Sequence, residues 1–144
     1  MKRTPSRFQE LLSMVLREFG PRVVSVTMFG SRVKRSARSD SDYDMIIMEQ
    51  LDRNPNVREE FVTSAIANIL LTSRVRISPL VLSREEAIRE VENGSPLLAT
   101  VFSNYEILYD PTRFMAELLD LTKRLRSSLV YVERGRAWNL ARTV

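Results

Sequence analysis

The chain has no cysteine and no histidine among its 144 residues. It therefore cannot form a disulfide framework or a thiolate metal site, and it lacks a histidine-based catalytic triad and the usual zinc ligands. No apolar run approaches the roughly 20 residues of a membrane-spanning helix, and the N-terminus leads into a charged amphipathic segment instead of a signal-peptide core. These absences predict a cytoplasmic protein without a membrane partner. They also restrict any metal to oxygen ligands, which favours Mg²⁺ or Mn²⁺.

The composition is that of a basic globular protein. A hydrophobic content of 44% over this length suits one domain with a sizeable core. The net charge of +4 favours anionic partners such as nucleotides or RNA. The basic residues are mostly arginine, which makes planar, bidentate contacts to phosphate or carboxylate.

The hydrophobic pattern predicts an alternation of helices and strands. Apolar residues recur at helical spacing in several segments, and short β-branched runs lie between them. Ser83 and Glu86 match a capping box at a helix start, and Pro79 predicts an edge position or a bulge for its strand. We expect helices over 6–19, 57–71, 83–92 and 95–102, and strands over 23–29, 42–48, 75–82 and 105–109.

A longer amphipathic helix is predicted from Pro111 to about Arg134. It either packs on the sheet or offers a surface for a dimer or a partner, and the pattern does not decide between these two. We therefore expect a main domain over residues 1–110, with a C-terminal helix and basic tail over 111–144 packed on it or on a partner.

Two aspartates at the start of a strand carry the clearest chemical signal. Asp42 and Asp44 are alternate residues of a strand, so they point to the same face with α-carbons roughly 6.5–7 Å apart. Carboxylates held this close repel each other, and a divalent cation between them removes the repulsion. The sequence therefore predicts a metal site on Asp42 and Asp44.

A glycine turn just upstream predicts a phosphate-binding loop. Gly30 allows a sharp turn and a close approach of phosphate to the backbone, and Ser31 adds a hydroxyl donor. The amides that follow can form an anion-binding nest. Arg32 and Arg38 supply positive charge in the connector. We therefore expect Gly30, Ser31, Arg32 and Arg38 to bind a nucleotide.

Gly30-Ser31, followed by Asp42-x-Asp44 and the apolar residues 45–48, resembles the DNA polymerase beta superfamily of nucleotidyltransferases. More narrowly, it resembles the minimal nucleotidyltransferases of archaea and bacteria. The motif covers residues 29–48, and the order of elements extends the likeness to about 6–109. The resemblance implies an α+β fold, with a mixed, palm-like β-sheet flanked by helices over the main domain.

The resemblance also implies a chemistry. ATP or another nucleoside triphosphate would bind at the Gly30-Ser31 turn, and Asp42 and Asp44 would be the catalytic ligands of Mg²⁺ or Mn²⁺. A nucleoside monophosphate, expected to be AMP, would pass to a hydroxyl group of a protein or RNA acceptor. Minimal nucleotidyltransferases commonly pair with a helical HEPN-domain RNase, for which they act as antitoxin. A HEPN-type partner is therefore expected, with RNA and a second copy of the chain as further candidate partners.

The sequence departs from the family pattern at Arg76. Active members typically carry a third metal-binding carboxylate on a neighbouring strand, and the corresponding position here is an arginine. Arg76 could contact a phosphate while Asp40 or Glu49 supplies the acid. Alternatively, Arg76 could pair with an aspartate and close the site, leaving a nucleotide-binding or protein-binding module that neutralises a partner by docking. An antibiotic-modifying enzyme is disfavoured, because such enzymes add a substantial acceptor domain and only about 35 residues follow Tyr109.

Overall fold

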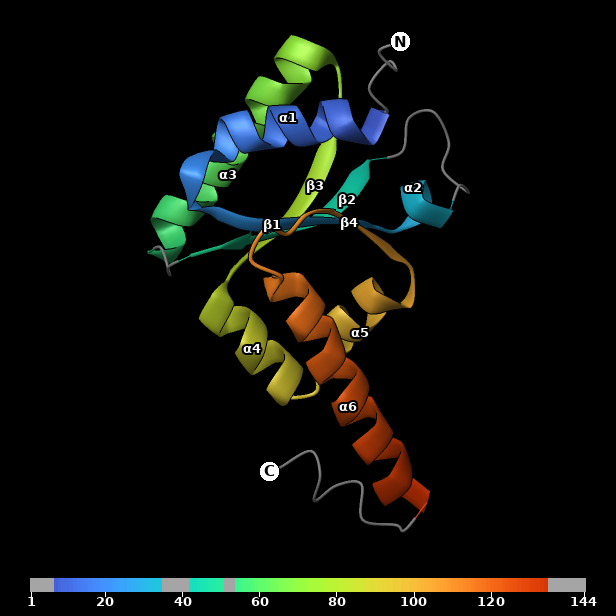
Figure 1. The fold of residues 1–144 in the computed structure, drawn as a ribbon. Helices are drawn as coiled ribbons and strands as arrows, with labels where there is room; N and C mark the ends of the chain where they lie inside the picture. Colours follow the sequence, from blue (N-terminus) through green and yellow to red (C-terminus); the bar gives the residue numbers. More distant parts are fainter. Residues whose placement is uncertain (1–6, 35–41, 51–53, 135–144) are drawn as a thin grey trace.

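The computed structural model describes residues 7–34, 42–50 and 54–134. Arg38, Asp40 and the C-terminal tail from residue 135 lie outside these ranges, so the expectations for them stay predictions. Figure 1 shows the elements, which in chain order are α1 (Arg7–Phe19), the 3₁₀ turn η1 (Gly20–Arg22), β1 (Val23–Phe29), α2 (Ser31–Lys34), β2 (Tyr43–Glu49), α3 (Pro55–Ser73), β3 (Ile77–Ser83), α4 (Arg84–Glu92), α5 (Pro96–Ser103), β4 (Tyr105–Tyr109) and α6 (Phe114–Arg134).

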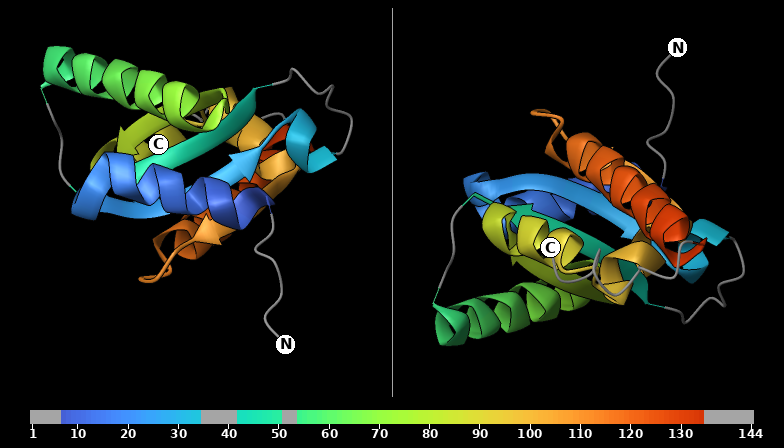
Figure 2. Two further views of the ribbon diagram at one scale, coloured as in Figure 1. Left: turned by 90° about the horizontal axis from the view of Figure 1, so that it is seen from above. Right: turned by 90° about the horizontal axis from the view of Figure 1, so that it is seen from below.

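The four strands form one mixed sheet in the order β3-β2-β1-β4. β1 is antiparallel to both β2 and β4, whereas β2 and β3 are parallel. Helices α1 and α3 lie on one face, and α4, α5 and α6 lie on the other (Figures 1 and 2). The predicted α+β fold, a mixed sheet flanked by helices, is confirmed.

β2 lies between two hydrophobic cores, one on each face of the sheet. Its side chains alternate between the two faces of the sheet. Met45 and Ile47 belong to the core beneath α1 and α3, whereas Ile46 and Met48 belong to the core beneath α4, α5 and α6. All four are fully buried, which explains why this strand reads as a continuous apolar run and not as an alternating one.

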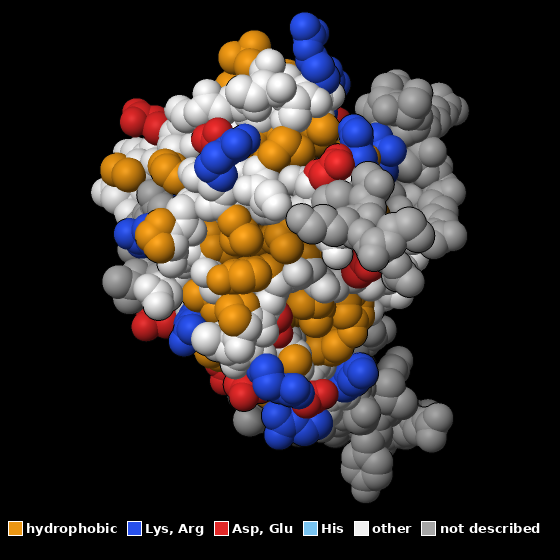
Figure 3. All heavy atoms as spheres, turned by 45° about the horizontal axis from the view of Figure 1, so that its top comes forward, with side chains coloured by type: hydrophobic (Ala, Val, Ile, Leu, Met, Phe, Trp, Pro, Cys, Tyr) orange, Lys and Arg blue, Asp and Glu red, His pale blue; other side chains and the backbone are white. Residues whose placement is uncertain are grey.

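The outer strands differ from β2 in their exposure. β4 is an edge strand whose residues are half-buried or exposed, and it runs along the front of the sheet between α1 and α6 (Figure 1). Figure 3 shows hydrophobic side chains in the middle of this face, with charged side chains above and below them. β3 is the opposite edge strand and contains Pro79, which confirms the edge position that the proline predicted.

Most predicted elements are found within two residues of their expected bounds, whereas α6, predicted from Pro111, begins three residues later at Phe114. β2 starts at Tyr43, one residue later than predicted, and ends at Glu49. α3 begins two residues early because the Asn54 side chain accepts a hydrogen bond from the Asn56 amide and Pro55 occupies the first turn. The Ser83–Glu86 capping box of α4 is confirmed.

The first half of α6 is part of the domain. Asp110 caps its start, accepting hydrogen bonds from the amides of Met115 and Ala116 at 3.0 Å each. Met115 and Leu118 are buried in the core with α4 and α5. Further along, α6 extends away from the sheet (Figure 1). Among the described residues, no helix has the length and apolar character needed to cross a membrane.

Candidate functional site

Asp42 and Asp44 lie where β2 begins, beside the end of β1. Asp44 is paired with Phe29 of β1 on one side and with Ser78 of β3 on the other. Asp42 directly precedes the strand, and its side chain is 43% exposed. Because strand residues alternate, both carboxylates lie on the α4–α6 face of the sheet, beyond the buried Ile46. The structure therefore brings the two predicted metal ligands together.

The electrostatics of this pair fit a bound cation. Partial burial, and then the negative charge of Asp42, raise the pKa of Asp44 above its ordinary value. Both causes disfavour the ionised carboxyl, and a divalent cation would reverse the second one. Within the described part of the chain, no group of three or more acidic side chains could hold a metal ion. Two carboxylates still suit Mg²⁺, which usually combines one or two protein carboxylates with water and substrate phosphates.

Gly30 shapes the turn against Asp44. Its φ of +80° is unfavourable for residues with a side chain. A Cβ at this position would also meet Oδ2 of Asp44 and lie 3.2 Å from its Cγ. The backbone of the predicted phosphate-binding turn therefore passes directly against the predicted metal ligand, and only glycine allows this approach.

The turn continues into a single helical turn. α2 starts at Ser31, and the Val33 amide donates to the Gly30 carbonyl at 3.1 Å. Ser31 thus lies immediately beside the glycine that contacts Asp44, while the binding of a nucleotide to Gly30 and Ser31 stays a prediction.

Arg32 lies over Tyr43, the residue between the two aspartates. Its Cζ is 4.2 Å from the centroid of the Tyr43 ring. Tyr43 is 5% exposed and belongs to the core beneath α1, on the face opposite Asp44. Its hydroxyl accepts a hydrogen bond from Nε of Arg7 at 3.1 Å, and Phe8 packs edge-on against its ring. Sequence reasoning missed Tyr43, although an aromatic residue between two strand aspartates was the available signal.

Arg76 stands next to the aspartates, just before β3. Its carbonyl accepts a hydrogen bond from the Tyr43 amide at 2.9 Å. Its Nε is 3.9 Å from Oδ1 of Asp42, and its side chain is 66% exposed. An exposed ion pair of this length contributes about 0–1 kcal/mol. The structure therefore places an exposed cationic side chain beside the two predicted metal ligands.

Glu49 does not supply the missing acid. It lies at the far end of β2, paired with Val23 and Ser83, and is 1% exposed. It is five positions along the strand from Asp44, a distance of about 17 Å. The hypothesis that Glu49 completes the site is wrong, because a strand of this length carries its two ends to opposite edges of the sheet.

Comparisons with known proteins agree with this architecture. No protein-family model matches the chain. A curated protein of Methanocaldococcus jannaschii, named "Putative protein adenylyltransferase MJ1305", is 22% identical over 136 residues, which cover 92% of this chain and 90% of that protein. Among solved structures, a chain of a toxin–antitoxin crystal structure with AMP-PNP aligns with a TM-score of 0.54 at 12% identity, covering 90% of this chain and 98% of that one. A chain from a variant of the MntA-HpeT toxin–antitoxin aligns equally well, covering 91% and 98%.

These similarities extend over nearly the whole length of each chain. At 12% identity, the solved structures share the fold with this chain, and the curated relative is similar in sequence across the same span. The resemblance to minimal nucleotidyltransferases is confirmed at this level. Gly30, Asp42 and Asp44 lie together at one end of the two central strands of this sheet.

Proposed function

We propose that this chain is a Mg²⁺-dependent nucleotidyltransferase that transfers AMP from ATP to a hydroxyl group of a protein, as the antitoxin of a toxin–antitoxin pair. The observation that carries the proposal is the contact of the Gly30 turn with Asp44, with Asp42 on the same face. The M. jannaschii relative, named for protein adenylyltransfer, supports a protein acceptor. The toxin–antitoxin structures, one of them with AMP-PNP, support nucleotide binding and the antitoxin role.

The residues of the site have separate tasks in this reaction. The Gly30-Ser31 backbone receives the phosphates, because glycine leaves room for a close approach. Asp42 and Asp44 would hold Mg²⁺, or Mn²⁺, which when bound offsets the charge of the triphosphate. The oxygen of the acceptor hydroxyl forms a bond to the α-phosphorus, and the bond from that phosphorus to the β-bridging oxygen breaks. Its electron pair leaves with pyrophosphate, and the hydroxyl proton is released to solvent.

A second candidate function is a module that binds nucleotide and docks on a partner without transferring AMP. The ion pair between Arg76 and Asp42 favours it, because a cation on Asp42 competes with a metal. Replacing both aspartates with asparagine separates the two functions. Neutralisation of a toxin by AMP transfer would be lost in this variant, whereas neutralisation by docking would persist.

The remaining assignments follow from the same proposal. The toxin would be a helical protein of the HEPN type. The part of residues 111–144 beyond the packed first half of α6 would dock on it, while residues 1–110 carry the nucleotide site. We infer a cytoplasmic location, because a toxin–antitoxin pair that uses ATP would act there. An RNA acceptor and a homodimer stay predictions from the sequence.

Intact-mass spectrometry tests the proposal. The purified chain is incubated with Mg²⁺-ATP and a HEPN-type protein encoded beside it. We expect that protein to gain the mass of one or more AMP groups, and the gain should disappear with the Asp42→Asn/Asp44→Asn variant. An unmodified partner that is still inhibited by the wild-type chain would favour the docking module instead.

A further inference from the structure

The start of β3 presents a second pair of polar side chains beside the aspartates. The parallel register pairs Asp44 with Ser78, and the hydrogen bond from the Tyr43 amide to the Arg76 carbonyl extends this pairing outward. Arg76 therefore neighbours Asp42 in the way that Ser78 neighbours Asp44. Because side chains alternate along both strands, the two aspartates, Arg76 and Ser78 lie on one face of the sheet. Arg76 and Ser78 are both exposed there.

The charge of Arg76 determines what this face can bind. A carboxylate at that position would help to hold a second divalent cation, whereas a guanidinium repels one. The guanidinium stays protonated at any physiological pH, and its planar fork matches phosphate oxygens in bidentate geometry. Arg76 therefore provides a permanent positive charge at the place where a second metal ion would otherwise provide it.

The contact that Arg76 makes in this structure leaves it able to change partner. Its Nε lies 3.9 Å from the Asp42 carboxylate, well beyond the roughly 2.7–2.9 Å of a strong charge-assisted hydrogen bond. The side chain is two-thirds exposed. A flexible arginine in a weak, solvated ion pair can exchange the carboxylate for a triphosphate that arrives on the same face.

We propose that Arg76 binds the triphosphate of the nucleotide, so that the site operates with a single metal ion on Asp42 and Asp44. This inference rests on the proposed nucleotidyltransferase function. On binding of Mg²⁺-ATP, the guanidinium leaves Asp42 for phosphate oxygens, and Asp42 becomes available to the metal. The side chain at position 76 thus binds the nucleotide and not a metal ion.

Nucleotide affinity gives the first test, with α,β-methylene-ATP as the probe because its α,β bond is not cleaved. Isothermal titration with Mg²⁺ present should show about 10- to 100-fold weaker binding for Arg76→Ala, and a smaller loss for Arg76→Lys, which keeps the charge but not the fork. Arg89→Ala is the matched control, because Arg89 is an exposed arginine of α4 away from the site. Thermal melts verify that each variant is folded. Equal affinity of Arg76→Ala and wild type would overturn the inference.

Metal stoichiometry gives the second test, with a readout other than activity. Mn²⁺ is titrated into the chain in the presence of saturating α,β-methylene-ATP. Electron paramagnetic resonance should then count one bound ion per wild-type chain. Arg76→Asp restores a carboxylate and should bind two. Two ions in the wild type would overturn the inference. Arg76-dependent nucleotide binding with one ion per chain, but without AMP transfer to any acceptor, would sustain the inference while refuting the proposed catalysis, so the two can fail separately.

Discussion

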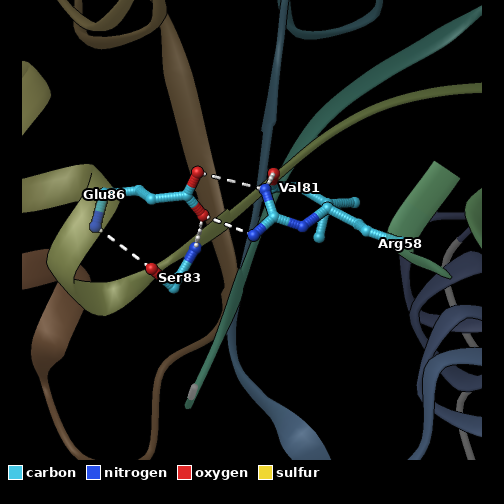
Figure 4. Close-up of polar contacts among 4 residues, drawn as sticks. All are labelled: Arg58, Val81, Ser83 and Glu86. Atoms are coloured by element: carbon cyan, nitrogen blue, oxygen red, sulfur yellow. Dashed lines mark hydrogen bonds and ion pairs between the residues drawn. The ribbon is translucent and has the colours of Figure 1, made fainter. Parts of the chain in front are cut away.

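Two arginine–carboxylate pairs flank the short edge strand β3, and they differ in almost every physical respect. At the end of the strand, Arg58 of α3 makes two hydrogen bonds to Glu86 of α4, at 2.6 and 3.2 Å (Figure 4). At its start, Arg76 reaches Asp42 only at 3.9 Å. The side chains of the first pair are 17% and 28% exposed, and those of the second are 66% and 43% exposed.

The first pair is a structural contact with several hydrogen bonds. Arg58 also donates to the Val81 carbonyl at 3.4 Å, and Glu86 accepts from the Ser83 amide at 3.0 Å within the capping box. Figure 4 shows the resulting connection from α3 past the edge of β3 to α4. Burial opposes ionisation of Glu86, but the hydrogen bonds from Arg58 and Ser83 and the charge of Arg58 outweigh it, so that its pKa is lowered. This pair holds the two helical layers together.

The second pair belongs to a site whose charges are not balanced among the residues that the structure describes. The pKa of Asp44 is raised, in the opposite direction to that of Glu86, because its burial and the charge of Asp42 are not compensated. The contrast indicates that the ionised carboxylates at the start of β3 are unfavourable in the free chain and that a bound ligand would stabilise them. The following predictions test this division between a structural end and a functional end of β3.

The largest effect is expected from the aspartates. Asp44→Asn removes a metal ligand, so AMP transfer should fall by about 10³-fold. The free energy of unfolding should stay unchanged or rise, because the variant also removes a carboxylate that is repelled in the folded state. Transfer assays and urea unfolding measure the two quantities. A clear loss of stability would contradict the description of this end as functional.

The turn that contacts Asp44 should be the next most sensitive position. Gly30→Ala places a methyl group against the carboxylate at a positive φ, and should cost about 2–4 kcal/mol of unfolding free energy. Gly94→Ala is the matched control, since Gly94 has a φ of +70° but no atom within 4 Å of its would-be Cβ, and it should cost only about 1 kcal/mol. Urea denaturation compares them. Equal losses would show that the contact with Asp44 is unimportant.

The two arginines should separate by stability. Arg58→Met should lower the free energy of unfolding by about 1–2 kcal/mol, because it leaves Glu86 half-buried without its charged partner. Arg76→Met should change it by less than about 0.5 kcal/mol, as expected for an exposed pair. Similar values from parallel urea titrations would remove the distinction between the two ends.

The smallest effect is the pH dependence of the structural pair. The pKa of Glu86 is lower in the folded state than in the unfolded state, so its stabilisation is fully present above the unfolded pKa near 4.5 and is lost as the pH falls through the folded value. The difference in unfolding free energy between wild type and Glu86→Gln should therefore shrink on acidification.

In metal-free buffer, the difference in unfolding free energy between wild type and Asp44→Asn should shift in favour of the wild type as the pH falls, because the pKa of Asp44 is raised in the folded state.

The sequence predicted the fold well because its signals were local. The capping box at Ser83, the proline of β3 and the apolar run of β2 each depend on neighbours along the chain. The convergence of Asp42 and Asp44 was also predictable, since it follows from strand alternation alone.

The rest of the site depends on contacts between distant segments. The approach of Gly30 to Asp44 requires the antiparallel register of β1 and β2. The stacking of Arg32 on Tyr43 requires that ring to face α1, and the distance of Glu49 from the site requires the strand direction. Strand alternation predicts which residues share a face of the sheet, but it does not predict which strands pair or which helices cover that face.

Isotope position in the donor nucleotide gives the most direct test of the central claim, that Gly30, Asp42 and Asp44 form an AMP-transfer site. The chain is incubated with Mg²⁺ and a HEPN-type partner, using ATP labelled at either the α- or the γ-phosphorus. We predict that α-label appears on the partner while γ-label leaves as pyrophosphate, and that Asp44→Asn abolishes the transfer. Labelling from the γ-position, or α-label transfer that survives Asp44→Asn, would contradict the account.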